Sequence, residues 1–143
     1  MENTGKTPAE LFAAQALAKQ LKNELTENIL PYWMTKVRKG YDGFHGRIDG
    51  HESVDPGAPV GNIMTARILW TFASSYRLLK DEAYLETAMA ARDLLIEKSY
   101  DSEHGGTYWS LDPEMKPLDT KKQIYAIAFT IYGLAEMARA CGD

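Results

Sequence analysis

The strongest candidate for chemistry in this sequence is an arginine that shares a helical face with a tryptophan. Arg67 lies four residues after Ile63 and three before Trp70, a spacing that places all three on one side of a helix. Sugars are held by aromatic faces packed against C–H surfaces and by charged groups that hydrogen-bond hydroxyls, because an unpaired buried polar group is costly. Arg67 is therefore a candidate binding residue. Its commoner alternative, an ion pair with a structural carboxylate, remains open.

A second candidate is the aromatic pair that follows two glycines. Tyr108 and Trp109 come directly after Gly105, Gly106 and one threonine, and adjacent residues of an extended segment point to opposite sides. One ring is thus expected to face a cavity and the other the core. The alternative is that both rings fill space between helices.

No histidine or carboxylate pattern predicts a metal site or a catalytic pair. His45, His51 and His104 match no metal-ligand spacing, and solvated or locally bonded histidine is the expected role. The loop carboxylates are more often caps than acids and bases: Asp42, Asp49, Asp55, Asp112 and Asp119. The sequence holds no phosphate loop, Gly-x-Ser-x-Gly elbow or dinucleotide fingerprint, and we expect neither a metal nor a cofactor.

Four long helices are expected to position these residues. The first begins at Pro8 with Thr7 as its cap, bends or restarts at Pro31, and ends near Gly40. The polar segment 1–7 is predicted to be disordered.

Apolar residues at spacings of three and four predict the other three helices. The second spans 63–79, and the third begins at an Asp81 cap and continues through Leu95. The fourth spans 124–137, with Asp119 or Thr120 as its predicted cap.

The order of elements repeats once along the chain. A helix, a Gly- and aromatic-bearing loop, a Pro-containing connection and a second helix recur, with Gly43 and Gly106 in comparable places 63 residues apart. The first loop, residues 41–50, is expected to form a small β-ribbon or a structured loop. A period of this length suits helical pairs stacked side by side, each of which needs neighbours to bury its apolar face.

Bulk properties narrow the partners and the compartment. A net charge of −4 and a pI near 5.4 disfavour nucleic-acid binding. The single Cys141 forms no internal disulfide, which favours a reducing cytoplasm. We expect no membrane-spanning stretch and no secretory signal, and hence a cytoplasmic location without membrane contact.

Five longer motifs occur in order along the chain: ELTENILPYW (24–33), GFHGRIDG (43–50), ARILWTF (66–72), GGTYWSLD (105–112) and DTKKQIYAIAF (119–129). Together they resemble the N-terminal part of the cellobiose 2-epimerases of the N-acylglucosamine 2-epimerase family, over nearly all of residues 20–143. The resemblance implies an all-α fold of helical hairpin repeats with short β-like loops. It also implies that residues 8–143 form about the first third of an (α/α)6 toroid of twelve helices, as one partial domain.

The same resemblance implies an isomerase that inverts C2 of a reducing-end aldose, such as the glucose unit of cellobiose. One histidine removes the proton next to the carbonyl, a cis-enediolate forms, and a second histidine returns a proton to the other face. By motif, Arg67 and Tyr108 correspond to substrate-binding residues. The catalytic histidines are expected beyond Asp143, so no catalytic residue is assigned here, and the chain alone is expected to be inactive.

Two other functions stay open from the sequence. One is an N-acylglucosamine 2-epimerase or a mannose isomerase of the same family. The other is a non-catalytic helical interaction module in which Arg67 and Tyr108 only pack. A truncated toroid is also expected to expose the apolar edges of the first and fourth helices, which predicts self-association or poor solubility.

Overall fold

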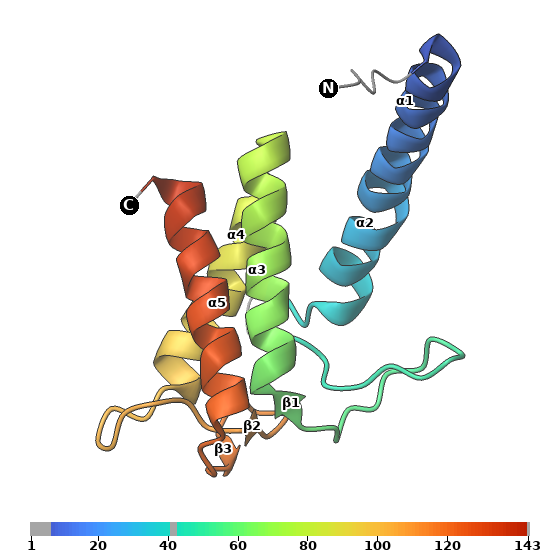
Figure 1. The fold of residues 1–143 in the computed structure, drawn as a ribbon. Coiled ribbons are helices and arrows are strands. Elements are labelled where there is room, and N and C mark those ends of the chain that lie inside the picture. The colour runs from blue at the N-terminus through green and yellow to red at the C-terminus, as the bar shows by residue number, and fades with distance from the viewer. Residues whose placement is uncertain (1–6, 41–42, 143) are drawn as a thin grey trace. The chain divides into compact units, whose positions relative to one another are not determined.

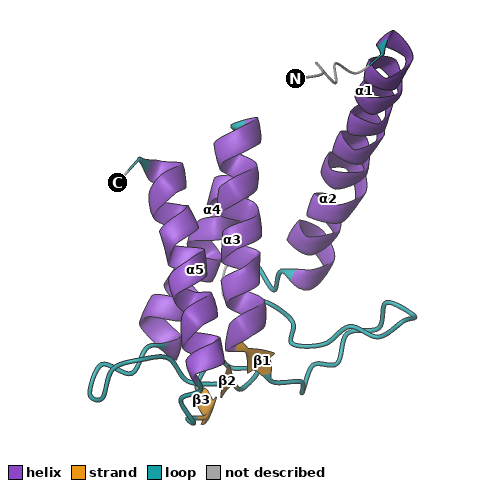
Figure 2. Ribbon diagram, in the orientation of Figure 1, coloured by secondary structure: helices purple, strands orange, loops and turns teal. Residues whose placement is uncertain are grey.

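The chain is helical, with three very short strands in the connections (Figure 2). A computed structural model describes residues 7–40 and 43–142, so Asp42 and most of the segment predicted to be disordered lie outside the described residues. The chain divides into two compact units at Lys36 and Val37. The predicted fold class, all-α with short β-like loops, is confirmed, whereas the single domain over 8–143 stays a prediction.

The first helix is continuous in its helical backbone from Pro8 to Val37. It comprises α1 (Pro8–Asn23), η1 (Glu24–Ile29), α2 (Leu30–Tyr32) and η2 (Trp33–Val37). Thr7 caps it as expected: the Glu10 N–H donates to Thr7 Oγ1 at 3.3 Å, and the Thr7 N–H donates to Glu10 Oε2 at 2.7 Å. This reciprocal pair satisfies two of the donors that a helix start leaves unpaired.

Pro31 does not restart the helix. The Leu30 N–H donates to Leu25 O, five residues back, so the turn before the proline is wider than an α-helical one. Such a turn of π-helix accommodates a residue that lacks an N–H. The backbone remains in helical conformation through Trp33.

The second unit holds three helical segments that match the predicted helices closely: α3 (Asn62–Leu79), α4 (Glu82–Asp93) continued by η3 (Leu94–Ser99), and α5 (Ile124–Cys141). Asp81 caps α4 as predicted, with its Oδ1 accepting from the Ala83 N–H at 3.0 Å. Helix α3 packs against both α4 and α5 (Figure 1). It is therefore the central helix of this unit.

A small antiparallel sheet joins the loops at the N-terminal ends of α3 and α5. Its strands are β1 (Val60–Gly61), β2 (Ser110–Leu111) and β3 (Pro117–Asp119), in the order β1-β2-β3. The prediction that Asp119 or Thr120 caps the fourth helix is wrong. Asp119 belongs to β3, and α5 begins after Gln123, whose side chain makes no capping bond.

The predicted repeat is confirmed by matched backbone bonds in its two loops. The His45 N–H donates to Val37 O and the Tyr108 N–H to Ser99 O, each at 2.8 Å. Nearer the tip of each loop, the Lys39 N–H donates to Gly43 O at 2.8 Å and the Asp101 N–H donates to Gly106 O at 2.9 Å. The first helix and the helix formed by α4 and η3 are therefore each followed by the same kind of ribbon, and the bridges Arg38–Phe44 and Ile48–Val54 agree with the β-like loop expected in the first of these places.

Helices α3 and α5 approach each other closely at a glycine. A Cβ on Gly133 would lie 2.7 Å from Ala66 O, a distance that real Cβ atoms do not reach. Further along, buried Glu136 of α5 accepts from Arg77 Nε of α3 at 2.8 Å and from Arg139 Nη1 at 3.1 Å. A backbone contact and an ion pair thus set the distance and the register between the two helices.

The expectation that no stretch is long and apolar enough to span a membrane is not met. Among the described residues, α5 is long and apolar enough to cross a membrane, with a mean hydropathy of 1.2 over 18 residues, 28% of them buried. The core helix of a soluble protein can pass the same test, and α5 carries Gly133 and the ion-paired Glu136 at its contact with α3. This packing accounts for part of its apolar composition, whereas Ile124 and Ile131 are exposed.

Replacing Gly133 by alanine is expected to destabilise the chain. The added methyl would push Ala66 O and the two helices apart, which costs about 1–3 kcal/mol, although alanine favours an isolated helix over glycine by about 1 kcal/mol. Urea denaturation monitored by circular dichroism measures the change. Gly50→Ala is the control, because a Cβ there meets nothing within 4 Å; equal stability of the two variants would refute the close contact.

Candidate functional site

A groove lined mainly by aromatic residues lies between α3 and α5. It has a volume of about 680 Å³ and is open to solvent. Its lining residues are Arg67, Trp70, Thr71, Tyr125, Ala128, Phe129 and Tyr132. The groove is large enough for a sugar unit, and its lining provides aromatic faces beside a cation.

The aromatic rings of the groove hold one another in place. Trp70 stacks on Tyr132, with ring centroids 5.1 Å apart and an interplanar angle of 9°. Phe129 meets Tyr132 and Tyr125 edge to face, at 6.2 and 5.0 Å. Stacked and edge-to-face arrangements are the favoured geometries of aromatic pairs, so these rings form a preformed wall.

Arg67 lies on this wall with its guanidinium over a ring. Its Cζ is 5.9 Å from the centroid of Phe129, within cation–π range. The side chain is exposed, and none of the described carboxylates forms an ion pair with it. The expected shared face with Trp70 is observed, and the alternative of a structural ion pair has no support in residues 7–40 and 43–142. The guanidinium donors are thus available to a ligand.

Tyr108 does not line the groove. It lies half-buried in the loop before α5, with Lys122 Nζ 5.8 Å from its ring centroid. Trp109 has a different lysine over it, Lys121 Nζ at 4.8 Å. The structure therefore places Arg67 and Tyr108 on separate elements, Arg67 in the second turn of α3 and Tyr108 in the loop that leads to β2. A binding role for either residue stays a prediction.

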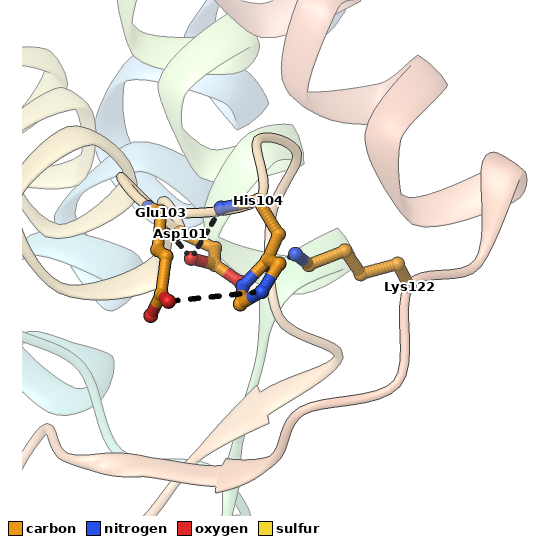
Figure 3. A network of polar contacts seen from close by, with 4 residues as sticks. All are labelled: Asp101, Glu103, His104 and Lys122. Carbon is orange, nitrogen blue, oxygen red and sulfur yellow. Dashed lines mark hydrogen bonds and ion pairs between the residues drawn. The ribbon is translucent and has the colours of Figure 1, made fainter.

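The Tyr108 loop is anchored by one carboxylate (Figure 3). Asp101 Oδ1 accepts from the backbone N–H groups of Glu103 and His104 at 3.0 and 3.1 Å, while Oδ2 is bonded to Lys122 Nζ. The hydrogen bond from Lys122 is the main reason that the pKa of Asp101 is held well below its usual range. Lys122 also faces Tyr108, so this ion pair ties the loop to the segment that enters α5.

The three histidines do not gather at the groove. His104 lies 3.5 Å from Asp101 Oδ2 and 3.9 Å from a Glu103 oxygen, and its side chain is exposed (Figure 3). His45 and His51 lie in the first loop. Within the described residues, no group of three or more His, Cys, Asp or Glu side chains is placed to hold a metal ion.

Sequence reasoning missed most of the groove. The sequence predicts Trp70 only as a residue on the helical face of Arg67, and it does not identify the aromatic residues of α5 as part of a site. Tyr125, Phe129 and Tyr132 stand at spacings of four and three, which places them on one helical face. This shared face was the signal that the sequence offered. It did not identify a site, because an aromatic stripe on a helix is equally consistent with burial in the core.

The helical fold of this chain matches part of the (α/α)6 toroid of cellobiose 2-epimerases of known structure. The chain belongs to the N-acylglucosamine 2-epimerase family. The family model described as N-acylglucosamine 2-epimerase (GlcNAc 2-epimerase) matches residues 43–143.

Curated relatives agree with this assignment. The chain is 54% identical over 130 residues to a cellobiose 2-epimerase of Bacteroides fragilis, covering 90% of this chain and 33% of the relative. It is 38% identical over 125 residues to a cellobiose 2-epimerase of Ruminococcus albus, covering 87% and 32%. The chain therefore spans about a third of the length of the curated relatives it matches.

Solved structures show the same fold. The structure of cellobiose 2-epimerase from Spirochaeta thermophila matches with a TM-score of 0.86 and 37% identity, over 96% of this chain and 34% of that one. A D-mannose isomerase matches with a TM-score of 0.70 at 23% identity, over 79% of this chain and 28% of that one. The latter likeness shows the fold alone.

Acidification is expected to loosen the Tyr108 loop through Asp101. Because its pKa is lower in the folded chain than in the unfolded one, the Asp101 carboxylate stabilises the fold above about pH 4. This contribution is lost as the pH falls through the lower, folded pKa. The stability difference between the wild type and Asp101→Asn should thus be greatest near neutrality and shrink in acid, as thermal unfolding from about pH 2 to 7 would measure.

Glu103→Gln is the matched control in the same loop, since Glu103 is exposed and, among the described residues, its carboxylate is paired with His104 alone, at 3.9 Å. It should follow the wild-type curve. An Asp101→Asn variant that loses as much stability at pH 2 as at pH 7 would contradict the assigned role of the carboxylate.

Proposed function

We propose that this chain forms the substrate-binding first third of a carbohydrate 2-epimerase, which inverts C2 of a reducing-end aldose such as that of cellobiose. The observation that carries the proposal is the groove in which Arg67 stands beside Trp70 and Phe129 without a carboxylate partner among the described residues. The identity of 54% to a cellobiose 2-epimerase supports the choice of substrate.

The proposed chemistry needs a cation at the reacting end of the sugar. Removing the proton next to a carbonyl leaves negative charge on oxygen in a cis-enediolate, and a positioned donor lowers the barrier by stabilising that charge. The Arg67 guanidinium offers several N–H donors in a planar fork. The aromatic wall would hold the C–H faces of the sugar ring and exclude water around it.

Proton transfer is assigned to no residue of this chain. His45, His51 and His104 are absent from the groove lining, and a general base must lie within hydrogen-bonding reach of the proton that it removes. The bases are therefore proposed to come from the parts of the family fold that this chain does not include. In this proposal the chain binds the sugar but supplies no base for proton transfer, so it is inactive by itself.

Tyr108 is proposed as a second sugar contact, from the loop at the N-terminal end of α5. Its ring is half-buried and lies beside Lys122 rather than in the packed core. A phenol gives a sugar hydroxyl both a hydrogen-bond donor and an acceptor. We further propose that the intact protein acts in the cytoplasm on a free sugar.

Replacing Arg67 by alanine is expected to lower kcat/KM for cellobiose by about 100-fold or more, the usual cost of losing one donor to a developing oxyanion. The assay is C2 epimerisation by a chimera in which this chain replaces the corresponding third of the Bacteroides fragilis cellobiose 2-epimerase. Arg92→Ala is the control, since Arg92 pairs with Asp93 on α4 at 2.7 Å, away from the groove. Unchanged turnover in Arg67→Ala would favour a non-catalytic helical module.

The isolated chain is expected to be inactive and to self-associate through α5. Ile124 and Ile131 are 86% and 64% exposed on that helix, and exposed apolar surface of this kind drives association. Light scattering should show species larger than 16.0 kDa, and Ile124→Glu with Ile131→Glu should reduce them. Leu78→Glu, an exposed leucine on α3, should not; a monomeric wild-type chain, or epimerase activity in it, would contradict the proposal.

A further inference from the structure

The loop that carries Tyr108 is held on both sides by one residue, Asn62. Asn62 is the first residue of α3 and is 2% exposed. Its backbone N–H donates to Trp109 O at 3.0 Å, which extends the β1–β2 ladder by one bond. Its side-chain Nδ2 lies 3.3 Å from Thr107 Oγ1. The residues before and after Tyr108 are therefore both bonded to Asn62.

The same side chain reaches helix α5. Asn62 Nδ2 donates to Thr130 Oγ1 at 2.9 Å and lies 3.3 Å from Ala126 O. A carbonyl oxygen only accepts, so the atom that faces Ala126 O is the amide nitrogen. Asn62 thus joins three elements: α3, which carries Arg67; the Tyr108 loop; and α5, which carries Phe129 next to Thr130.

This arrangement leaves one polar atom without a partner. Asn62 Oδ1 is buried and accepts no hydrogen bond from the described residues. An unsatisfied buried acceptor is unfavourable and calls for a reason. The neighbouring hydroxyls do not need Asn62, since Thr130 donates to Ala126 O at 3.1 Å and lies 3.3 Å from Thr107 Oγ1. Stability alone would favour an apolar side chain of similar shape at this position.

We infer that Asn62 is a positioning residue, which fixes the Tyr108 side chain relative to Arg67 by holding both of its neighbours. The inference rests on the proposed role of Tyr108 in sugar binding. Asn62 touches no substrate itself. Its amide spans the gap between the start of α3 and the start of α5, so any movement of the Tyr108 loop away from these two helices must break its hydrogen bonds.

The first test uses the 143-residue chain and needs no activity. Asn62→Leu keeps the approximate shape and removes both the donors and the orphan acceptor. We expect amide hydrogen exchange at Tyr108, whose N–H donates to Ser99 O, to become at least about tenfold faster, while the melting temperature changes little. Unchanged protection at residues 107–109 would overturn the inference, and a large fall in melting temperature would give Asn62 a purely structural role.

Thr87→Val is the matched control. Thr87 is a fully buried threonine on α4. Its hydroxyl donates to Ala83 O at 3.0 Å and accepts from Arg38 Nη1 at 3.3 Å, and neither bond involves the Tyr108 loop. This variant should lower the melting temperature without changing exchange at Tyr108. Faster exchange at Tyr108 in Thr87→Val would show that the loop responds to general destabilisation, against a specific role for Asn62.

The second test is a double-mutant cycle in the epimerase chimera. Asn62→Leu and Tyr108→Phe should each lower kcat/KM for cellobiose by about tenfold, and the double variant should lose little more than either one. Multiplying effects would overturn action through Tyr108. If Tyr108→Phe alone has no effect, the proposed role of Tyr108 fails, whereas an effect of Tyr108→Phe without one of Asn62→Leu overturns only the inference drawn here.

Discussion

The close approach of α3 and α5 is the constraint on which the candidate site depends. Gly133 permits it by leaving room for Ala66 O, and the residue after Ala66 is Arg67. Because a helix places residues three and four apart on one face, the geometry at Gly133 also aligns Trp70 with Tyr132 and Arg67 with Phe129. Beyond the groove, the ion pair of Arg77 with buried Glu136 holds the same two helices at their far ends. The groove is therefore a consequence of backbone packing rather than of flexible side chains.

The loops at the N-terminal ends of α3 and α5 are held by hydrogen bonds and an ion pair. Asp101 accepts hydrogen bonds from two backbone N–H groups and from Lys122 (Figure 3), and Asn62 is bonded to both neighbours of Tyr108. Polar bonds in a partly buried setting are directional and stronger than in water, which suits a segment that must hold a side chain in one orientation. The Tyr108 loop also repeats an earlier feature of the chain, since the first helix and η3 are each followed by a ribbon with the same backbone bonds.

Much of the framework could be predicted from the sequence, because it depends on local rules. Helical periodicity predicted the first residues of α3 and α5 to within one position. The cap at Asp81 follows from residue type alone. The predicted cap at Asp119 failed because that residue pairs in β3 with a strand distant in sequence. The bonds of Asn62 to Thr107 and Thr130 span 45 and 68 residues, and no local pattern signals them. The motifs that resemble the family located Arg67, whereas the aromatic wall around it became visible only once two helices were placed together.

The chemistry and the framework divide unevenly between this chain and the rest of the family fold. The chain supplies a cation over an aromatic wall, which suits binding and stabilisation of an oxyanion, and none of its three histidines lines that wall. Epimerisation at C2 requires bases on both faces of the carbon, and the positions of such bases must be fixed to within a fraction of an ångström. In the proposed enzyme, these bases would come from the parts of the family fold that this chain does not include. The groove between α3 and α5 is open to solvent, with Arg67, Tyr125 and Tyr132 exposed, whereas Ile68, Leu69 and Phe72 of α3 are buried.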